Sequence, residues 1–309
     1  MPELTVERVT KRYGSKVAVD SISFEAKPGR VLGLLGPNGA GKTSSIRMIT
    51  YITVPDEGKV MFDGKSVGPW SQQRMGYLPE ERGLYKKLKV GEQLLYFAEL
   101  KGMPRKKAIE QIRYWLDGFD ASDWMAKKTQ ELSKGMQQKV QFISTLLHQP
   151  DLLILDEPFS GLDPINTELL KDVIQEQKES NRTILFASHR MEQVELLCDD
   201  ICLISNGQIL IQGSLRDVKA SFGRNRIILE YEGNGQFIDD LAAKKLVEVG
   251  PTSANRAELK LVNGTRSKAV LEYAMQHTED VIRFECVEPS LNEIFVSAVE
   301  QQNSSPVLA

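Results

Sequence analysis

The sequence lacks the features of a membrane-spanning, disulfide-rich or nucleic-acid-binding protein. No apolar run approaches the ~20 residues that a helix needs to cross a bilayer. The net charge of −3 gives no electrostatic case for nucleic acid as the main partner. Its three cysteines, Cys198, Cys202 and Cys286, form neither an even disulfide set nor a C-x-x-C pair, so we expect small buried hydrophobes in a reducing compartment. The N-terminus carries no charged-then-apolar secretion signal, and we therefore expect a cytoplasmic protein.

The length and the pattern of apolar residues indicate two domains. A chain of 309 residues, 41% hydrophobic and 26% charged, is long enough for one large core and a smaller neighbour. Strands dominate to about residue 85, a helical pattern occupies about 86–150, and strands and helices alternate again from 151. After a change of pattern near Gly213 to Gly223, we expect the following parts: a large domain over 1–215, a small α+β domain over 222–300, and a tail without fixed structure over 301–309.

One short stretch carries the clearest chemistry, the run Gly36-Pro37-Asn38-Gly39-Ala40-Gly41-Lys42-Thr43. It satisfies the phosphate-loop pattern G-x-x-x-x-G-K-[ST] in full, after an apolar strand at 31–35 and before a helix that can continue from Ser44. Glycines let the backbone curl close to a polyphosphate, which then faces successive N–H groups and the positive end of the helix. Lys42 would reach the β- and γ-phosphates, the Thr43 hydroxyl would ligate Mg²⁺, and Ser44 would join the nucleotide-binding residues. The plainer alternative is a glycine-rich turn that matches by chance.

A second apolar strand, at 152–155, ends in the acidic pair Asp156-Glu157. Carboxylates at the carboxyl end of a parallel strand fall in the crevice where α/β sheets bind ligands. Asp156 would hold Mg²⁺ through its water shell, and Glu157 would orient or deprotonate an attacking water. Taken alone, the pair could simply be acids at a strand end; the upstream phosphate loop favours the catalytic interpretation.

Between these two motifs lies the run Leu132-Ser133-Lys134-Gly135-Met136-Gln137-Gln138-Lys139, which resembles the LSGGQ signature of ATP-binding-cassette (ABC) ATPases. The other motifs of that family follow in order. The run Ser160-Gly161-Leu162-Asp163 resembles the D-loop, His189 ends a strand where the family keeps its switch histidine, and Tyr13 is spaced to stack on adenine. The resemblance covers roughly residues 3–215. Tyr13 could instead pack at a strand end, and Ser133 could be an ordinary helix cap, a role compatible with anion binding.

The resemblance implies a P-loop NTPase fold of class α/β, with a RecA-like core, an antiparallel β subdomain and a helical signature subdomain. It implies ATP and Mg²⁺ as cofactors and a head-to-tail homodimer. In that dimer Ser133 and Gly135 of one subunit would contact the γ-phosphate bound by Lys42 of the other. Asp163, in the D-loop, would also belong to the nucleotide-binding residues. It also implies a separate membrane permease as partner, which would hold the chain at the inner face of the cell membrane.

Three residues depart from the family pattern. Lys134 stands where the signature usually has Gly, and Met136 where it has Gln. Glu80 stands where the family has the glutamine that meets Mg²⁺ and faces the permease, so we count Glu80 with Thr43 and Asp156 as a metal ligand.

These variants are familiar from the NatA-like, exporter-type branch, and the segment 288–295 resembles the ending of that branch's accessory domain. The function that follows is ATP hydrolysis that drives an exporter. Two alternatives stay open: an ATP-gated dimerising module with weak or regulatory hydrolysis, and a soluble ABC protein without a transport role. Nothing in the sequence names the cargo.

Overall fold

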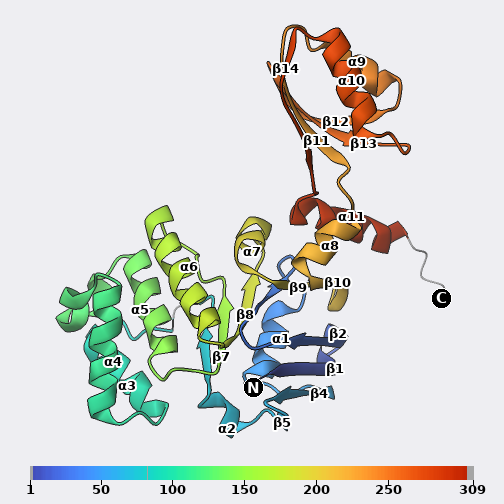
Figure 1. Cartoon of the computed structure of the whole chain (residues 1–309). Helices are drawn as coiled ribbons and strands as arrows, with labels where there is room; N and C mark the ends of the chain where they lie inside the picture. The colour runs from blue at the N-terminus through green and yellow to red at the C-terminus, as the bar shows by residue number, and fades with distance from the viewer. Residues whose placement is uncertain (1–2, 82, 305–309) are drawn as a thin grey trace. The chain divides into compact units, whose positions relative to one another are not determined.

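The structure is a computed structural model that describes residues 3–81 and 83–304. It divides the chain into two compact units, Met1–Leu215 and Arg216–Ala309, which we call the N-terminal and C-terminal units (Figure 1). No helix among the described residues is long and apolar enough to cross a membrane. Cys198 and Cys202 are buried, Cys286 is half-buried, and all three are free thiols, in line with the expectation of small hydrophobes.

The N-terminal unit contains two sheets. The first is antiparallel, in the order β2-β1-β4-β5, and its strands are β1 (Leu4–Tyr13), β2 (Lys16–Ala26), β4 (Glu57–Phe62) and β5 (Lys65–Ser66). The second has the order β10-β9-β3-β8-β7-β6 and is parallel except for β10. Its strands are β3 (Val31–Leu35), β6 (Met75–Leu78), β7 (Leu152–Asp156), β8 (Thr183–Ser188), β9 (Asp200–Ser205) and β10 (Gln208–Ser214).

The sequence pattern of each strand reflects how its faces are covered. Strands β3, β7 and β8 are buried at every position, as expected for central parallel strands that are covered on both faces and are apolar along most of their length. Strand β2 instead alternates between buried and exposed positions near its end, because one of its faces meets solvent. Apolar side chains of both sheets and of helix α1 (Lys42–Ile49) form one continuous core, which fixes the start of α1 beside the end of β3.

Helices complete the N-terminal unit. Three of them, α3, α4 and α5, lie on the side of the parallel sheet away from β1 and β2, within the stretch expected to be helical (Figure 1). Between β6 and β7 the chain forms α3 (Val90–Leu100), α4 (Arg105–Gly118), the short 3₁₀ turns Ser122–Ala126 and Thr129–Glu131, and α5 (Lys134–Leu146). The remaining helices are α2 (Pro69–Gln72), α6 (Pro164–Glu179) and α7 (Met191–Leu197).

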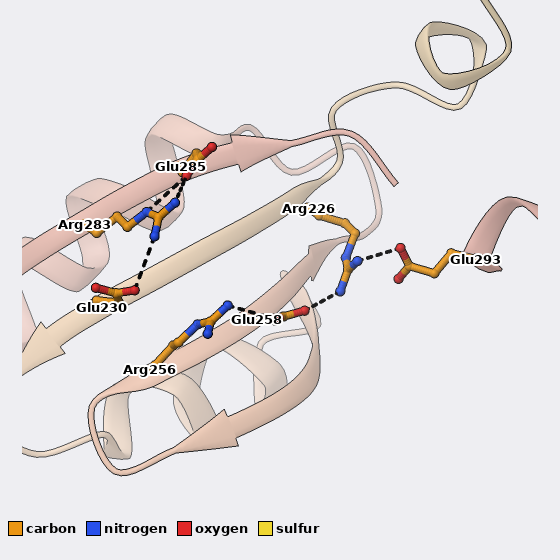
Figure 2. A network of polar contacts seen from close by, with 7 residues as sticks. All are labelled: Arg226, Glu230, Arg256, Glu258, Arg283, Glu285 and Glu293. Carbon is orange, nitrogen blue, oxygen red and sulfur yellow. Dashed lines mark hydrogen bonds and ion pairs between the residues drawn. The ribbon is translucent and has the colours of Figure 1, made fainter. Parts of the chain in front are cut away.

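The C-terminal unit is a four-stranded antiparallel sheet with helices. Its strands, in the order β12-β13-β11-β14, are β11 (Arg226–Glu232), β12 (Val247–Ser253), β13 (Arg256–Leu261) and β14 (Asp280–Val287). Its helices are α8 (Leu215–Ser221), α9 (Gln236–Ala243), α10 (Ser267–His277) and α11 (Leu291–Ser304). Apolar residues of α9, α10 and one sheet face form its core, whereas the charged side chains of Figure 2 are paired outside that core.

The residue pattern of this unit predicts strands around 226–231, 258–262 and 281–287, a helix around 267–276 and a final helix after Pro289. These correspond to β11, β13, β14, α10 and α11, whereas α8, α9 and β12 were not predicted. Helix α9 follows two glycines, which mark a loop, yet its short apolar face (Phe237, Ile238 and Leu241) is buried in the core. The stretch between Gly213 and Gly223 forms α8 where a change of pattern was the only signal. Helix α11 continues through Ser304, so the expected unstructured tail begins too early, and 305–309 lie outside the described residues.

Candidate nucleotide-binding site

The central sheet brings four of the predicted motifs to one edge. In the order β3-β8-β7-β6 these strands are adjacent and parallel, so their carboxyl ends meet at the same edge of the sheet. The phosphate loop follows β3, His189 follows β8, the pair Asp156-Glu157 ends β7, and Glu80 lies just after β6. This edge is where open α/β sheets bind their ligands. Residues from four distant parts of the sequence therefore gather around one point because of the strand order.

The phosphate loop adopts a backbone that only glycine tolerates at two places. Gly36 has φ 147° and Gly41 has φ 114°, both in the region that favours glycine. A Cβ at Gly36 would lie 2.1 Å from the Ile204 carbonyl oxygen, and one at Gly41 would lie 2.6 Å from that of Ala18. The tight curve leads directly into α1, so the loop amides and the helix N-terminus form an anion site.

Lys42 lies inside this loop and is only 7% exposed. Its Nζ donates hydrogen bonds to the carbonyl oxygens of Gly36 (2.6 Å) and Pro37 (3.2 Å). Burial lowers the pKa of the Lys42 ammonium, while the charges of Glu157, Asp156 and Glu80 act in the opposite direction. A buried ammonium bonded to neutral carbonyls is well placed to exchange them for phosphate oxygens.

Asp156 is 3% exposed, and its environment favours the protonated form of the carboxyl group. Burial, and then the nearby charges of Glu80 and Glu157, raise the pKa of Asp156 to about 6, although Lys42 lowers it. A cation placed beside this carboxylate would remove that penalty. Thr43 and Glu80 line the same cavity as Asp156, so oxygen ligands suited to Mg²⁺ are present. The described residues contain no cluster of three or more His, Cys, Asp or Glu side chains that could hold a metal ion.

The carboxylate of Glu157 is held by the end of β8. Ser188 Oγ donates to Glu157 Oε2 (3.0 Å), and the His189 backbone N–H donates to Oε1 (2.7 Å). His189 Nδ1 lies 2.6 Å from the same Oε1. Glu157 itself has φ 50°, a left-handed backbone that is uncommon outside glycine and is concentrated at functional sites. The buried carboxylate therefore has a fixed orientation, while the ring of His189 is half exposed.

The phosphate loop and the acidic residues enclose a cavity of about 230 Å³. Its lining combines the phosphate loop, the carboxylates and the first strand pair: Tyr13, Lys16, Ala18, Asn38, Gly39, Ala40, Gly41, Lys42, Thr43, Ser44, Glu80, Asp156 and Glu157. Tyr13 is 46% exposed, so its ring is available for stacking rather than packed into the core. The structure thus brings together Tyr13, most of the phosphate loop and all three carboxylates.

The signature and the D-loop form a separate group outside that cavity. Ser133 Oγ accepts a hydrogen bond from the Met136 N–H (3.2 Å), so Ser133 caps α5. A Cβ on Gly135 would lie 3.6 Å from the Gly161 carbonyl oxygen, which places the signature beside the D-loop. Asp163 caps α6 by accepting from the Asn166 N–H (2.9 Å). Ser133, Gly135 and Asp163 are therefore ordered by helix caps and do not line the cavity around Lys42.

Several residues around the carboxylates were not predicted from the sequence. Ser188 holds Glu157, and the only signal for it is a polar residue at the end of an apolar strand. Lys16 and Ala18 line the cavity because β2 pairs with β1, which no motif indicates. Gln138 and Gln141 donate to backbone carbonyl oxygens next to Glu157 and Glu80, respectively. In the sequence these two glutamines are indistinguishable from ordinary helix residues.

Comparisons with known proteins decide the family. A model of the ABC transporter family matches residues 19–160, a model of the C-terminal domain of DrrA1-3-like ATP-binding proteins matches 213–299, and an AAA-domain model matches 128–193. Over 297 residues the chain is 43% identical to the ABC transporter ATP-binding protein YhaQ of Bacillus subtilis, which covers 96% of this chain and 98% of YhaQ. The chain belongs to the ATP-binding proteins of ABC transporters.

Other relatives support the branch that the sequence indicated. The chain is 31% identical over 304 residues to the linearmycin resistance ATP-binding protein LnrL of Bacillus subtilis (95% of this chain, 97% of LnrL). It is 35% identical over 226 residues to the ABC transporter ATP-binding protein NatA of the same organism (71% of this chain, 92% of NatA). A solved ATP-binding subunit of an ABC transporter superposes with a TM-score of 0.68 at 30% identity, covering 71% of this chain and 93% of that chain.

These findings confirm the predicted family, the α/β P-loop NTPase fold and the NatA-like resemblance. ABC ATP-binding cassettes bind and hydrolyse ATP, so this chain is an ATPase. The roles of its individual residues, Mg²⁺, the homodimer and the permease remain proposals.

Proposed function

We propose that this chain is the ATP-hydrolysing subunit of an ABC exporter, in which two copies close head-to-tail over two ATP molecules and drive a separate permease. The main support for this proposal is that residues of the phosphate loop line one cavity together with Asp156, Glu157 and Glu80. The similarity to LnrL, a linearmycin resistance ATP-binding protein, favours export. We further propose that residues 222–300 are an accessory domain and that 1–215 carry the chemistry.

The dimer follows from the two separate groups of residues. One chain holds one phosphate loop, and its own Ser133 and Gly135 do not line the cavity around that loop. A signature that caps a helix but faces no nucleotide in its own chain is suited to complete the site of another copy. A two-fold arrangement would then form two equal composite sites, each with Lys42 from one subunit and Ser133 from the other.

The chemistry would run through groups that the structure orients. Mg²⁺ held by Thr43 and Asp156, with Glu80 beside them, would neutralise charge on the phosphates. Lys42 would bind the β- and γ-phosphates, and Tyr13 would stack on the adenine. Glu157, fixed by Ser188 and His189, would orient the attacking water and accept its proton. Because bonds from β8 fix the carboxylate of Glu157, little of its orientation must be achieved during the reaction.

We propose that the permease binds at a second cavity, of about 260 Å³. It lies between the end of β6 and helices α3 and α5, and it is lined by apolar residues that include Leu84, Phe97 and Leu100. Beside it, the exposed Tyr85 stacks on Phe97 and meets the exposed Tyr96 edge-on, while Tyr96 and Phe97 pack with tilted rings. The three rings form an aromatic surface of the kind that marks a protein interface. Pro79 lines this cavity and the next residue, Glu80, lines the nucleotide cavity, so one short loop separates the two.

Two measurements test the proposed function. The purified chain should hydrolyse Mg-ATP and form an ATP-dependent dimer on size-exclusion chromatography. A tagged copy should retain a membrane protein with several spanning helices after detergent solubilisation. A chain that turns over ATP but retains no such protein would favour a non-transport ABC protein. A complex that binds ATP without measurable turnover would favour the ATP-gated module.

A further inference from the structure

Helix α5 carries two glutamines that point into the interior of the N-terminal unit. Gln138 is 2% exposed and Gln141 is 4% exposed, and their spacing of one helical turn places them on one side of the helix. Burying a side-chain amide is costly unless it is hydrogen-bonded. The partners of these two amides therefore show what they do.

Both amides bond to the backbone next to a carboxylate of the nucleotide cavity. Gln141 Nε2 donates to the carbonyl oxygens of Pro79 (3.3 Å) and Glu81 (3.2 Å), the two residues that flank Glu80. Gln138 Nε2 donates to the carbonyl oxygen of Pro158 (3.0 Å), which follows Glu157. One side of α5 is thus attached to both loops that present carboxylates to the nucleotide.

The amide of Gln141 is not explained by packing. Its Oε1 is buried and has no hydrogen-bond partner among the described residues, so an apolar side chain of equal length would avoid the cost of burying that oxygen. What an apolar side chain would lose is the pair of bonds that fixes the backbone on each side of Glu80. The bonds also span elements that are far apart in the sequence, since Gln141 belongs to α5 and Glu80 follows β6.

We propose that Gln141 is a positioning residue for Glu80 and that, with Gln138, it makes α5 a direct link between the signature and both carboxylates. The signature caps the first turn of α5 through Ser133, and Gln141 lies roughly 12 Å along the same helix. This inference rests on the proposed function, in which the signature engages the ATP of the partner subunit. Engagement at one composite site would then set the position of Glu80 and Glu157 in the other.

The test uses the full-length chain with Gln141→Met, which keeps the length of the side chain but cannot donate. Mn²⁺ serves as the probe in place of Mg²⁺, and its binding in the presence of a non-hydrolysable ATP analogue is measured by electron paramagnetic resonance. We expect Gln141→Met to weaken Mn²⁺ binding about tenfold, the usual effect of losing a partner that orients a metal ligand. Binding of the analogue without divalent cation should stay within about twofold of wild type, and hydrogen exchange at the Glu80 and Glu81 amides should increase.

Two comparisons separate positioning from loss of structure. Gln93→Met removes another fully buried amide of the helical region, one that bonds Tyr85 and Thr129 rather than carbonyls beside a carboxylate, and it should leave Mn²⁺ binding at the wild-type value. In a Glu80→Ala background, Gln141→Met should have no further effect on Mn²⁺ binding, because the ligand that Gln141 positions is gone. Wild-type Mn²⁺ affinity in Gln141→Met, or full additivity with Glu80→Ala, would overturn the inference. Failure of the wild-type chain to dimerise with ATP would overturn the proposed function instead.

Discussion

The two units of this chain treat their charged side chains in opposite ways. In the N-terminal unit Lys42, Asp156 and Glu157 are all less than 10% exposed, and they meet at the carboxyl ends of parallel strands. Among the described residues of the C-terminal unit, no charged side chain is buried. Its charges instead pair with one another, as Figure 2 shows for Arg226 with Glu258 and Glu293.

Unpaired polar atoms follow the same division. Within the described residues, every buried side-chain nitrogen or oxygen without a hydrogen-bond partner lies in the N-terminal unit: Trp115 Nε1, Gln141 Oε1, His148 Nδ1 and Arg182 Nε. Burial also perturbs its ionisable groups, raising the pKa of Asp156 and lowering that of Lys42. Among the described residues, buried charges and unpaired buried polar atoms therefore occur in the N-terminal unit, whereas the charged side chains of the C-terminal unit are at least partly exposed and several of them pair with one another.

The largest effect should come from Glu157→Gln. Glutamine keeps the shape of the side chain but cannot accept a proton from water, so we expect turnover to fall about 10²–10⁴-fold. ATP binding should persist, and the closed dimer should accumulate with Mg-ATP on size-exclusion chromatography. Arg283→Gln, in the C-terminal unit, is the matched control and should retain wild-type turnover. A Glu157→Gln protein that hydrolyses ATP at the wild-type rate would show that another group is the base.

A smaller effect should come from His148, a buried polar group of the N-terminal unit outside the site. Its Nε2 lies 3.0 Å from the Met75 carbonyl oxygen, and burial, assisted by the charge of Lys101, lowers the pKa of His148 to about 4. The unfolded chain, with an ordinary histidine pKa of 6.5, then binds more protons between pH 6.5 and pH 4. Stability from this group is therefore complete above pH 6.5 and is lost as the pH falls towards 4.

In the His148→Gln variant, the loss of unfolding free energy on acidification should be smaller than in wild type by about 2 kcal/mol. Fluorescence can follow the N-terminal unit alone, because all three tryptophans (Trp70, Trp115 and Trp124) lie in it. Denaturant titrations at pH 7.5 and pH 4.5 would compare the two proteins. The same loss of stability on acidification in both would show that His148 does not carry the acid sensitivity.

Sequence reasoning predicted the residues that line the candidate nucleotide cavity better than the contacts that surround them, for a physical reason. Phosphate loops and acidic strand ends follow local rules, because glycine conformation and strand alternation act within a few residues. The contacts that fix Glu157 and Glu80 depend instead on strand order and on helix α5, and they join Ser188 or Gln141 to residues far away in the chain. No local pattern announces them.

The C-terminal unit shows the same limit in its fold. Strands β11 and β14 were predicted from the sequence, whereas β12, which is exposed at almost every position, was not. Strand β12 is held in the sheet mainly by its backbone bonds to β13, and a polar edge strand of this kind leaves little trace in the sequence. Sequence reasoning missed β12 because backbone hydrogen bonds, which do not depend on the side chains, supply most of its stabilisation.

Glu80→Gln should have a more moderate effect, on metal dependence rather than on ATP binding. A carboxylate beside Mg²⁺ and the γ-phosphate adds negative charge, and direct ligation of the hard cation would offset the repulsion. We expect Gln to raise the Mg²⁺ concentration for half-maximal ATPase activity by about tenfold and to change the stimulation by the permease. Rates measured against Mg²⁺, with and without permease, decide the matter. Superimposable curves in both conditions would mean that Glu80 is only a surface charge.

The smallest effects should come from the charge pairs of the C-terminal unit. They test whether these pairs stabilise only that unit and leave ATP hydrolysis unchanged. Arg226 is 20% exposed at its side chain and joins β13 to α11 through Glu258 (2.6 Å) and Glu293 (2.5 Å). Arg283, in β14, is 49% exposed and pairs with Glu285 of the same strand and with Glu230 of β11. The pairs of Arg226 are less exposed, so solvent screens them less and their loss should cost more.

Arg226→Gln should therefore lower the local stability of β11 and α11 by about 1 kcal/mol, and Arg283→Gln should lower it by less. Hydrogen exchange of the full-length chain, followed by mass spectrometry, reports this opening free energy segment by segment. Both variants should bind and hydrolyse ATP like wild type, because neither arginine lines the nucleotide cavity. The proposal that the N-terminal unit alone carries the chemistry would be contradicted if Arg226→Gln changed ATP turnover without changing hydrogen exchange. A charge pair within one unit would then control the reaction in the other.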